Sequence, residues 1–269
     1  MGTLIDDLIA RVLEVIEQHP LRIKKISKGF RFTATLLEDG SCGMCFSVYN
    51  QEPIDSCEYV RSVKSMDQLD IVKILQFAKD SNENLEKLIG ISTLNAISQH
   101  ILKEHSENYH FTFDTDPIDH IEFEETDRVV MIGGIKAFLP KLQELVEDFV
   151  VIDKRLNNTK LPYMKSLETT QDYLHQADIV LITGSAIANN TLETLLKWIK
   201  TAKEVAVVGP SAGFVPEPLF DRGVTIVSGM QVLEPHKVMN IIADDGGTPH
   251  FKTYCKKYNI FRKGTGRKL

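Results

Sequence analysis

The feature that most constrains this chain is an apolar run that passes directly into a loop of small residues and then into a helical pattern. Residues 178–183 (DIVLIT) are predicted to form a buried strand. The residues after them, Gly184, Ser185 and Ala186, carry little bulk, so backbone N–H groups of this loop can approach a ligand. A helix is expected to follow, capped by one of three residues: Asn189, Asn190 or Thr191. Open α/β sheets build ligand sites from a strand, a loop and a helix in this order.

The same construction recurs elsewhere in the second half of the chain. Further short strands are predicted at residues 128–132, 149–152, 204–208 and 224–227. Small or polar residues follow these strands: Gly133 and Gly134, Asp153, Gly209 with Pro210 and Ser211, and Ser228 with Gly229. Helix-length segments separate most of the strands, which indicates a parallel sheet with right-handed crossovers. Because the carboxyl ends of parallel strands meet at one edge, we expect these loops to line one pocket.

The first part of the chain has a different pattern. Helical periodicity is followed by turn-separated strands, which predicts an antiparallel meander, and then by further helical segments. The helices are expected at residues 3–17, 66–78 and 84–103, and the strands at 22–26, 30–37 and 43–49.

Between residues 105 and 127 the periodicity is lost and acidic residues dominate, as in a solvated linker. We therefore predict an α/β protein with a smaller α+β domain over residues 1–112 and a doubly wound parallel sheet over residues 113–269.

Composition disfavours several classes of protein. A net charge of −6 offers no basic field for a nucleic acid. No apolar run reaches the roughly 18 residues that a membrane helix needs, so no membrane association and a cytoplasmic location are expected. Four cysteines in 269 residues do not make a disulfide framework, and we expect free thiols. One dense group of basic residues is expected to form a solvated terminus: Lys256, Lys257, Arg262, Lys263, Arg267 and Lys268.

Three long segments carry a resemblance to a known family. They read ITGSAIANNTLETLL at residues 182–196, VVGPSAGFVPEPLFDRGV at 207–224 and VSGMQVLEP at 227–235. In these segments the chain resembles the bacterial and archaeal family named for heavy-metal chelation, formerly domain of unknown function 364. The first part, including ISTLNAI at residues 91–97, resembles the companion domain of that family, which has the fold of the enolase N-terminal domain. The resemblance implies a Rossmann-like C-terminal domain and a site at the junction of the two domains.

The resemblance also implies which residues contact the ligand. Gly184, Ser185, Asn189 and Thr191 match a T-G-x-x-x-x-N-x-T pattern, with Asn190 where a glycine is common. The G-P-S turn at residues 209–211 also matches, although Ala212, Gly213 and Phe214 replace the usual Thr-Pro continuation. Asn95 matches the asparagine of the N-terminal helix, and Asp153 stands where a longer glutamate is common. The ligand-binding set is Asn95, Gly133, Asp153, Gly184, Ser185, Asn189, Thr191, Gly209, Pro210, Ser211 and Gly229.

Other motifs admit two interpretations. Cys42 and Cys45 have CxxC spacing, but residues three apart on a strand point to opposite faces, so a structural role is favoured over a thiol ligand role. His236 either begins a helix or joins the ligand edge. No G-x-S-x-G elbow surrounds Ser185 or Ser211, which disfavours a serine hydrolase. The G-x-G-x-x-G motif of dinucleotide-binding folds is absent after the first strand, which disfavours dinucleotide binding. Asp153 nevertheless lies about 20 residues after Gly133, where a ribose-binding acid would stand.

The loops predict a protein that binds a small molecule in the cleft between the domains, and the resemblance implies that it chelates a heavy metal or binds a metal chelate or a small anion. The alternative is an enzyme acting on a phosphate- or carboxylate-bearing metabolite, a Rossmann-like transferase or lyase, and the sequence leaves catalysis and oligomeric state open. Few groups at the cleft could bind a metal directly, so a metal ion is expected to arrive with an organic ligand. Those groups are Asp153, Glu217, Glu234 and His236.

Overall fold

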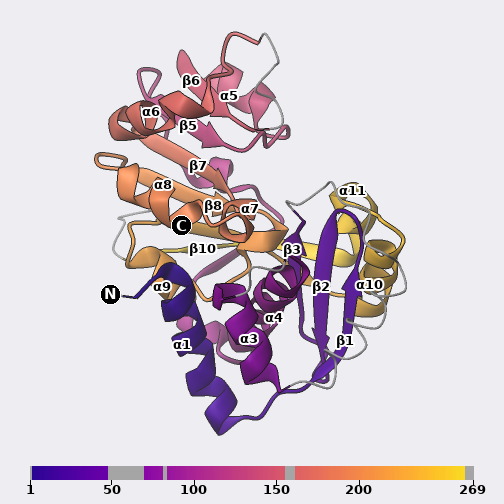
Figure 1. The fold of residues 1–269 in the computed structure, drawn as a ribbon. Helices are drawn as coiled ribbons and strands as arrows, with labels where there is room; N and C mark the ends of the chain where they lie inside the picture. Colours follow the sequence, from indigo (N-terminus) through magenta and orange to yellow (C-terminus); the bar gives the residue numbers. More distant parts are fainter. Residues whose placement is uncertain (1, 48–69, 81–83, 155–160, 264–269) are drawn as a thin grey trace.

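The computed structural model describes residues 2–47, 70–80, 84–154 and 161–263, which form an α/β structure with two sheets (Figure 1). Within these residues the larger sheet has seven strands in the order β4–β10–β9–β8–β7–β5–β6. The neighbours from β6 to β9 are parallel, whereas β10 is antiparallel to both β9 and β4. The strands are β4 (Phe111–Phe113), β5 (Arg128–Ile132), β6 (Asp148–Ile152), β7 (Ile179–Thr183), β8 (Glu204–Val208), β9 (Ile226–Val232) and β10 (Cys255–Phe261).

Helices connect the parallel strands, as the alternating pattern predicts. The chain places β6 on one side of β5 and then β7, β8 and β9 on the other, so the strand order reverses between β5 and β7. Ligands of doubly wound sheets bind beside such a reversal, at the carboxyl ends of the strands. The connecting helices are α5 (Leu139–Leu145), α6 (Thr170–Gln176), α7 (Ser185–Ala188), α8 (Leu192–Trp198) and α9 (Glu217–Phe220).

The smaller sheet is an antiparallel meander of β1 (Ile23–Lys28), β2 (Phe32–Leu37) and β3 (Cys42–Phe46). Helices α1 (Leu4–Gln18), α3 (Ile71–Asp80) and α4 (Asn84–Glu104) lie together, and α4 packs on β2 and β3. Two helices from the end of the chain, α10 (Pro235–Ala243) and α11 (Thr248–Phe251), lie on the other side of this sheet (Figure 1). Their apolar residues Val238, Met239, Ile242 and Phe251 pack with Phe32, Ala34, Leu36, Cys42 and Met44.

The two parts share one hydrophobic core. Residues of α1, α3 and α4 and residues of β5, β7 and β8 belong to the same buried cluster. Polar contacts cross the same junction, because Arg222 donates to the carboxylate of Asp7 at 2.6 Å. The cluster includes Leu8, Val12, Leu75, Ile91, Leu94, Ile97, Val130, Val180, Ile182 and Val207.

The fold class is confirmed: a small antiparallel sheet with helices precedes a mostly parallel sheet with helices. The division at residues 112 and 113 stays a prediction, to be tested by producing residues 113–269 alone. That boundary falls inside β4, and α10 and α11 pack on the first sheet. Among the described helices, none has the length and apolar character required to cross a bilayer.

Three expectations about elements are wrong. Residues 255–261 are not a solvated tail but strand β10, in which Tyr258 is 2% exposed. The expected linker contains β4, which pairs with β10. The strand predicted at 224–227 is β9, which continues to Val232, so Ser228 and Gly229 lie inside it and do not close it. The remaining strands match within a few residues, and the predicted elements at residues 48–49 and 66–69 lie outside the described ranges.

Candidate functional site

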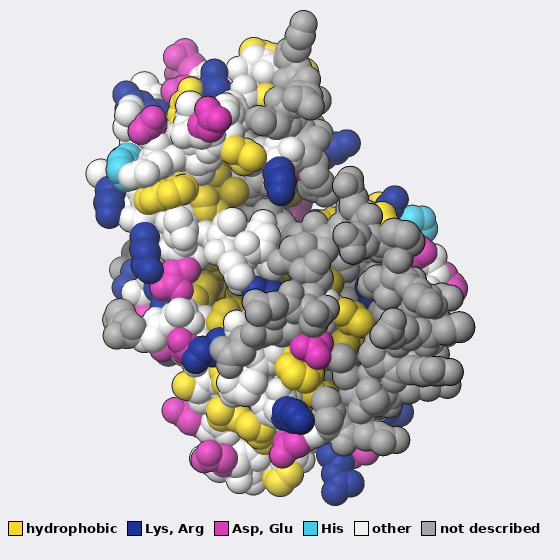
Figure 2. All heavy atoms as spheres, in the orientation of Figure 1, with side chains coloured by type: hydrophobic (Ala, Val, Ile, Leu, Met, Phe, Trp, Pro, Cys, Tyr) yellow, Lys and Arg dark blue, Asp and Glu magenta, His cyan; other side chains and the backbone are white. Residues whose placement is uncertain are grey.

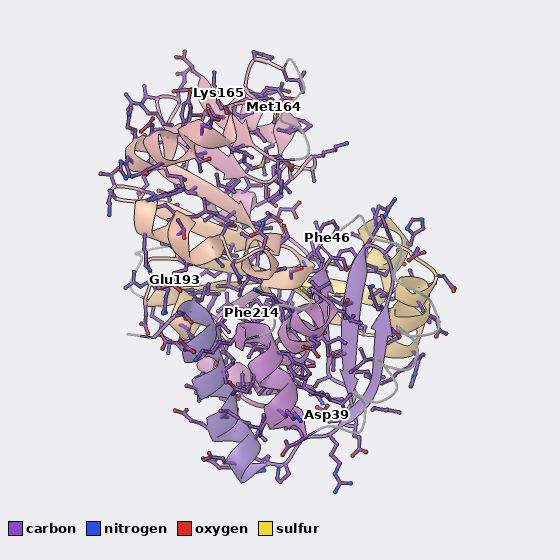
Figure 3. The ribbon with its side chains drawn as sticks, in the orientation of Figure 1. Asp39, Phe46, Met164, Lys165, Glu193 and Phe214 are labelled. Carbon is purple, nitrogen blue, oxygen red and sulfur yellow. The ribbon has the colours of Figure 1, made fainter. Side chains whose placement is uncertain are left out.

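A cavity of about 170 Å³ lies where the hairpin of the small sheet meets the carboxyl ends of β7 and β8. The large sheet contributes the loops after both strands, and the small sheet contributes two phenylalanines. Figure 3 places Phe46 at the end of β3 that approaches the large sheet. The lining residues are Phe32, Phe46, Thr183, Gly184, Ser185, Val208, Gly209, Pro210, Ser211 and Thr248.

The loop after β7 forms the first wall. Gly184 donates its N–H to the carbonyl of Val208 at 2.8 Å, which ties this loop to the end of β8. A Cβ at Gly184 would lie 2.7 Å from the backbone nitrogen of Ala212, so only glycine allows the two loops to approach this closely. The hydroxyls of Thr183 and Ser185 lie 3.2 Å apart at the cavity. The wall therefore presents two neighbouring hydroxyl groups on a closely packed backbone.

The loop after β8 forms the second wall. Gly209 has φ of +120°, a conformation that L side chains rarely adopt, and it allows the chain to turn sharply at the strand end. Ser211 is 2% exposed, and its Oγ accepts a hydrogen bond from the N–H of Phe46 at 2.8 Å. The Asn95 side chain, 1% exposed, donates to the carbonyl of Pro210 at 3.1 Å. This loop is thus held directly against the small sheet and α4.

Two predicted residues lie beside the cavity without lining it. Gly133 follows β5 with φ of +85°, and a Cβ there would come within 2.5 Å of the Thr183 methyl. Asp153 follows β6, is 5% exposed, and accepts the N–H of Gly134 at 2.6 Å. The carboxylate of Asp153 therefore fixes the Gly133–Gly134 turn at the point where the strand order reverses.

Three predicted residues lie elsewhere. Asn189 accepts hydrogen bonds from the N–H and hydroxyl of Thr191, at 3.2 and 2.5 Å, at the start of α8. Neither residue is among those that line the cavity. Gly229 lies inside β9 against the ring of Tyr258, so it supports strand packing and not the edge of the sheet. Its assignment to the strand end is wrong because the strand is longer than its apolar pattern indicates.

The cysteine pair follows the alternation of a strand. Cys42 belongs to the buried cluster with α10, whereas Cys45 belongs to the cluster with α4, so the two thiols face opposite sides of β3. Burial raises the pKa of both thiols, which disfavours the thiolate that metal binding needs. Cys57 lies outside the described residues.

The other candidate metal ligands do not converge. Glu217 accepts the hydroxyl of Tyr109 at 2.8 Å. Glu234 pairs with Lys237 at 2.7 Å, and His236 is exposed in the first turn of α10. Across the described part of the chain, no group of three or more His, Cys, Asp or Glu side chains is placed to hold a metal ion.

Sequence reasoning missed five of the lining residues: Phe32, Phe46, Thr183, Val208 and Thr248. It also missed Gln99, which donates to the carbonyl of Gly213 at 2.6 Å behind the cavity. The two phenylalanines begin and end a hairpin pair, where Phe32 is opposite Phe46. Nothing in their local pattern indicates that the large sheet lies beside them, because the loops that they face are distant in sequence; Phe46 and Ser211, for example, are 165 residues apart.

The chain matches two family models, each described as "Putative heavy-metal chelation". The DUF364 model matches residues 116–261, and the DUF4213 model matches residues 10–98. An uncharacterized protein of Methanocaldococcus jannaschii is 23% identical over 185 residues, which cover 67% of this chain and 68% of that protein.

Two solved structures share the fold. A protein of unknown function from the DUF364 family of Pyrococcus horikoshii has a TM-score of 0.78 and 23% identity, covering 96% of this chain and 100% of the other. A protein of unknown function from the same family in Desulfitobacterium hafniense has a TM-score of 0.76 and 16% identity, covering 96% and 99%. Since the DUF364 model alone spans more than half of the sequence, this chain belongs to the DUF364 family, whose description reads "Putative heavy-metal chelation".

Proposed function

We propose that this chain binds a small anionic ligand, or a metal carried by such a ligand, in the cavity between the small sheet and the ends of β7 and β8. One observation carries the proposal. Two loops with close backbone packing, after adjacent parallel strands, face a pair of phenylalanines across a space of about 170 Å³. Concave sites that combine apolar walls with a few placed polar groups are the usual small-molecule sites of such folds.

The chemistry of the lining supports a ligand with hydrogen-bond acceptors. Its polar side chains are the hydroxyls of Thr183, Ser185, Ser211 and Thr248. Each hydroxyl can donate one hydrogen bond to a phosphate or carboxylate oxygen. Arg31 supplies a cation near Thr248, because its Nη1 lies 3.2 Å from the position of a Cβ on the neighbouring Gly247.

The same lining supports a metal that arrives already bound to an organic molecule. Soft transition metals prefer thiolate and imidazole ligands, and harder ones prefer carboxylates. The described lining contains none of these groups. A chelate, by contrast, presents carboxylate or phosphate oxygens on its outside, and these suit the hydroxyl-lined wall.

Binding is favoured over catalysis on the same grounds. General acid–base catalysis needs a titratable side chain within hydrogen-bond reach of the substrate. None of the described lining residues titrates near neutral pH, and Asp153 is engaged by the Gly133–Gly134 turn. The enzyme alternative would need a group that this lining does not supply.

The test is stabilisation by ligands of known chemistry. Inorganic phosphate, citrate and ferric citrate are added to the full chain, and the thermal unfolding midpoint is measured. A ligand at 100 times its Kd stabilises the folded state by about 2.7 kcal/mol. We expect at least one probe to raise the midpoint, and the double variant Thr183→Val, Ser185→Ala to lose most of that increase.

A matched control removes a hydroxyl that does not line the cavity. Thr170 is 7% exposed, and its Oγ1 donates to the carbonyl of Leu167 at 2.6 Å. Thr170→Val should keep the full ligand response. The proposal is wrong if no probe stabilises the wild-type chain, or if the double variant responds as the wild type does.

A further inference from the structure

The cavity wall formed by residues 209–213 is held from behind by two side chains of α4. Asn95 and Gln99 are four residues apart and so lie one above the other on the same helix face. Asn95 Nδ2 donates to the carbonyl of Pro210 at 3.1 Å, and Gln99 Nε2 donates to the carbonyl of Gly213 at 2.6 Å. Both side chains are buried, at 1% and 7% exposure. The two amides therefore fix the two ends of the G-P-S-A-G loop.

The Asn95 amide also holds strand β3, which carries Phe46 at the cavity. Its Nδ2 donates to the carbonyl of Met44 at 2.9 Å, two residues before Phe46 on β3. The N–H of Phe46 in turn donates to Ser211 Oγ at 2.8 Å, on the loop that Asn95 holds. One side chain thus joins the strand that carries Phe46 to the loop that carries Pro210 and Ser211. The separation between strand β3 and the 209–213 loop depends on this connection.

Close packing leaves these contacts no room to adjust. A Cβ on Gly213 would lie 2.7 Å from both Asn95 Oδ1 and Gln99 Nε2, and a Cβ on Gly43 would lie 2.1 Å from the backbone nitrogen of Ala96. Gln99 Nε2 also lies 2.8 Å from the hydroxyl of Tyr258, a residue that is 2% exposed. Burial raises the pKa of Tyr258, so its hydroxyl stays protonated and uncharged at neutral pH.

We propose that Asn95 and Gln99 are positioning residues, which set the distance between strand β3 and the 209–213 loop at the cavity and do not contact the ligand. This rests on the function proposed above, but it concerns residues whose amides are already engaged by protein carbonyls. A carbonyl that loses its buried donor is left desolvated and unpaired, which makes the closed loop less favourable. Loss of either amide should therefore release the loop without unfolding the domain.

The experiment compares three variants of the full chain. Asn95→Asp replaces the donating nitrogen by oxygen, and Gln99→Met removes the amide at nearly constant length. Ser98→Ala is the matched control, because Ser98 is buried on the same helix but its Oγ donates to Leu94 within the helix at 2.8 Å. Amide hydrogen exchange of the 209–214 segment and the thermal unfolding midpoint are measured for each, together with the midpoint increase caused by inorganic phosphate.

We expect Asn95→Asp and Gln99→Met to speed exchange in this segment by about tenfold in the native state, because local opening costs less free energy. They should also weaken phosphate binding by a similar factor, whereas Ser98→Ala lowers the midpoint without either effect. The proposal is overturned if exchange in the segment follows the midpoint equally in all three variants. If Asn95→Asp does not fold, Gln99→Met decides alone. Absence of phosphate binding in the wild type would count against the proposed function, and the exchange comparison would still decide the positioning role.

Discussion

The first helix of the chain is bound at its start by a residue 189 positions away in sequence: the backbone N–H of Leu4 donates to Glu193 Oε2 at 2.7 Å. Leu4 begins α1, and Glu193 lies in the first turn of α8 (Figure 3). The first N–H groups of a helix have no partner within it, so a carboxylate there both accepts a hydrogen bond and meets the positive end of the helix dipole. Together with the Arg222–Asp7 pair, this contact ties the small helical layer to the large sheet.

Glu193 is therefore expected to contribute to stability in a pH-dependent way. The hydrogen bond from Leu4 is the largest cause that lowers the pKa of this carboxyl. A lowered pKa in the folded state means that the contribution is present above the unfolded pKa and is lost as the pH falls through the folded value. We expect Glu193→Gln to lower the free energy of unfolding by about 1 kcal/mol at pH 7, and by much less at pH 3.

Urea unfolding of the wild type and the variant at both pH values measures this difference. Glu14→Gln is the control, because Glu14 pairs with Arg11 on the exposed surface of α1, where ion pairs contribute little. A difference between wild type and Glu193→Gln that stays constant from pH 7 to pH 3 would contradict the assigned role.

The buried thiols are expected to be unreactive in the folded protein. Burial raises the pKa of Cys42 and Cys45, and it raises that of the half-buried Cys255 to about 12. The thiolate is the reactive form, so an aromatic disulfide reagent at pH 8 should modify these cysteines only after unfolding. Mass spectrometry of labelled peptides assigns each site. Rapid native labelling of Cys45 would show that the α4 side of β3 opens readily.

The sequence predicts the large sheet well because its signal is local. Each parallel strand is a short apolar run followed by small residues, and the helices between them show their own periodicity. Strand β10 was beyond this reasoning because its charges are balanced by residues distant in sequence. Lys257 pairs with Asp116 at 2.6 Å, 141 residues away, and Lys256 lies over the ring of Phe113. Figure 2 shows acidic and basic side chains interspersed on the viewed face.

The lining of the cavity follows in part from the sequence for the same reason. The small residues at Gly184 and Gly209 mark these loops in the sequence, and both loops line one cavity. Phe46 and Thr248 reach that cavity only because the small sheet and α11 pack against the large sheet, and no local pattern encodes such packing. Asn95 was identified by resemblance alone, and its geometry indicates contacts to two carbonyls that the sequence could not have specified.

The backbone at Gly209 offers a test of the loop without a steric clash. Its φ is +120° and a Cβ there would meet nothing within 4 Å, so Gly209→Ala introduces backbone strain alone. We expect a loss of about 1–2 kcal/mol in the free energy of unfolding and a weaker response to phosphate, because the strained loop shifts its wall of the cavity. Gly40, with φ of +90° and equally open space in the β2–β3 turn, is the matched control.

Gly40→Ala should lose a similar free energy of unfolding while keeping the full phosphate response. Chemical denaturation gives the first quantity, and the unfolding midpoint with and without phosphate gives the second. Equal phosphate responses in the two variants would remove the link between the Gly209 conformation and ligand binding.

Gly229 should prove to be a packing residue of the large sheet. A Cβ on Gly229 would lie 2.3 Å from Tyr258 Oη and 2.4 Å from Cζ, and Gly229 is opposite Tyr258 in the β9–β10 pairing. The ring cannot move away easily, because Tyr258 is 2% exposed and its hydroxyl meets Gln99. Gly229→Ala should therefore lower the free energy of unfolding by about 1–3 kcal/mol through overpacking.

A double-mutant cycle with Tyr258→Leu isolates that contact, since removal of the ring leaves space for the added methyl group. We expect the cost of Gly229→Ala to shrink by at least about 1 kcal/mol in the Tyr258→Leu background, as contacting residues usually couple. Urea unfolding of the four proteins supplies the cycle. Equal costs in the two backgrounds would mean that the ring does not occupy the space beside Gly229, and the glycine would then need another explanation, such as a backbone approach by a ligand.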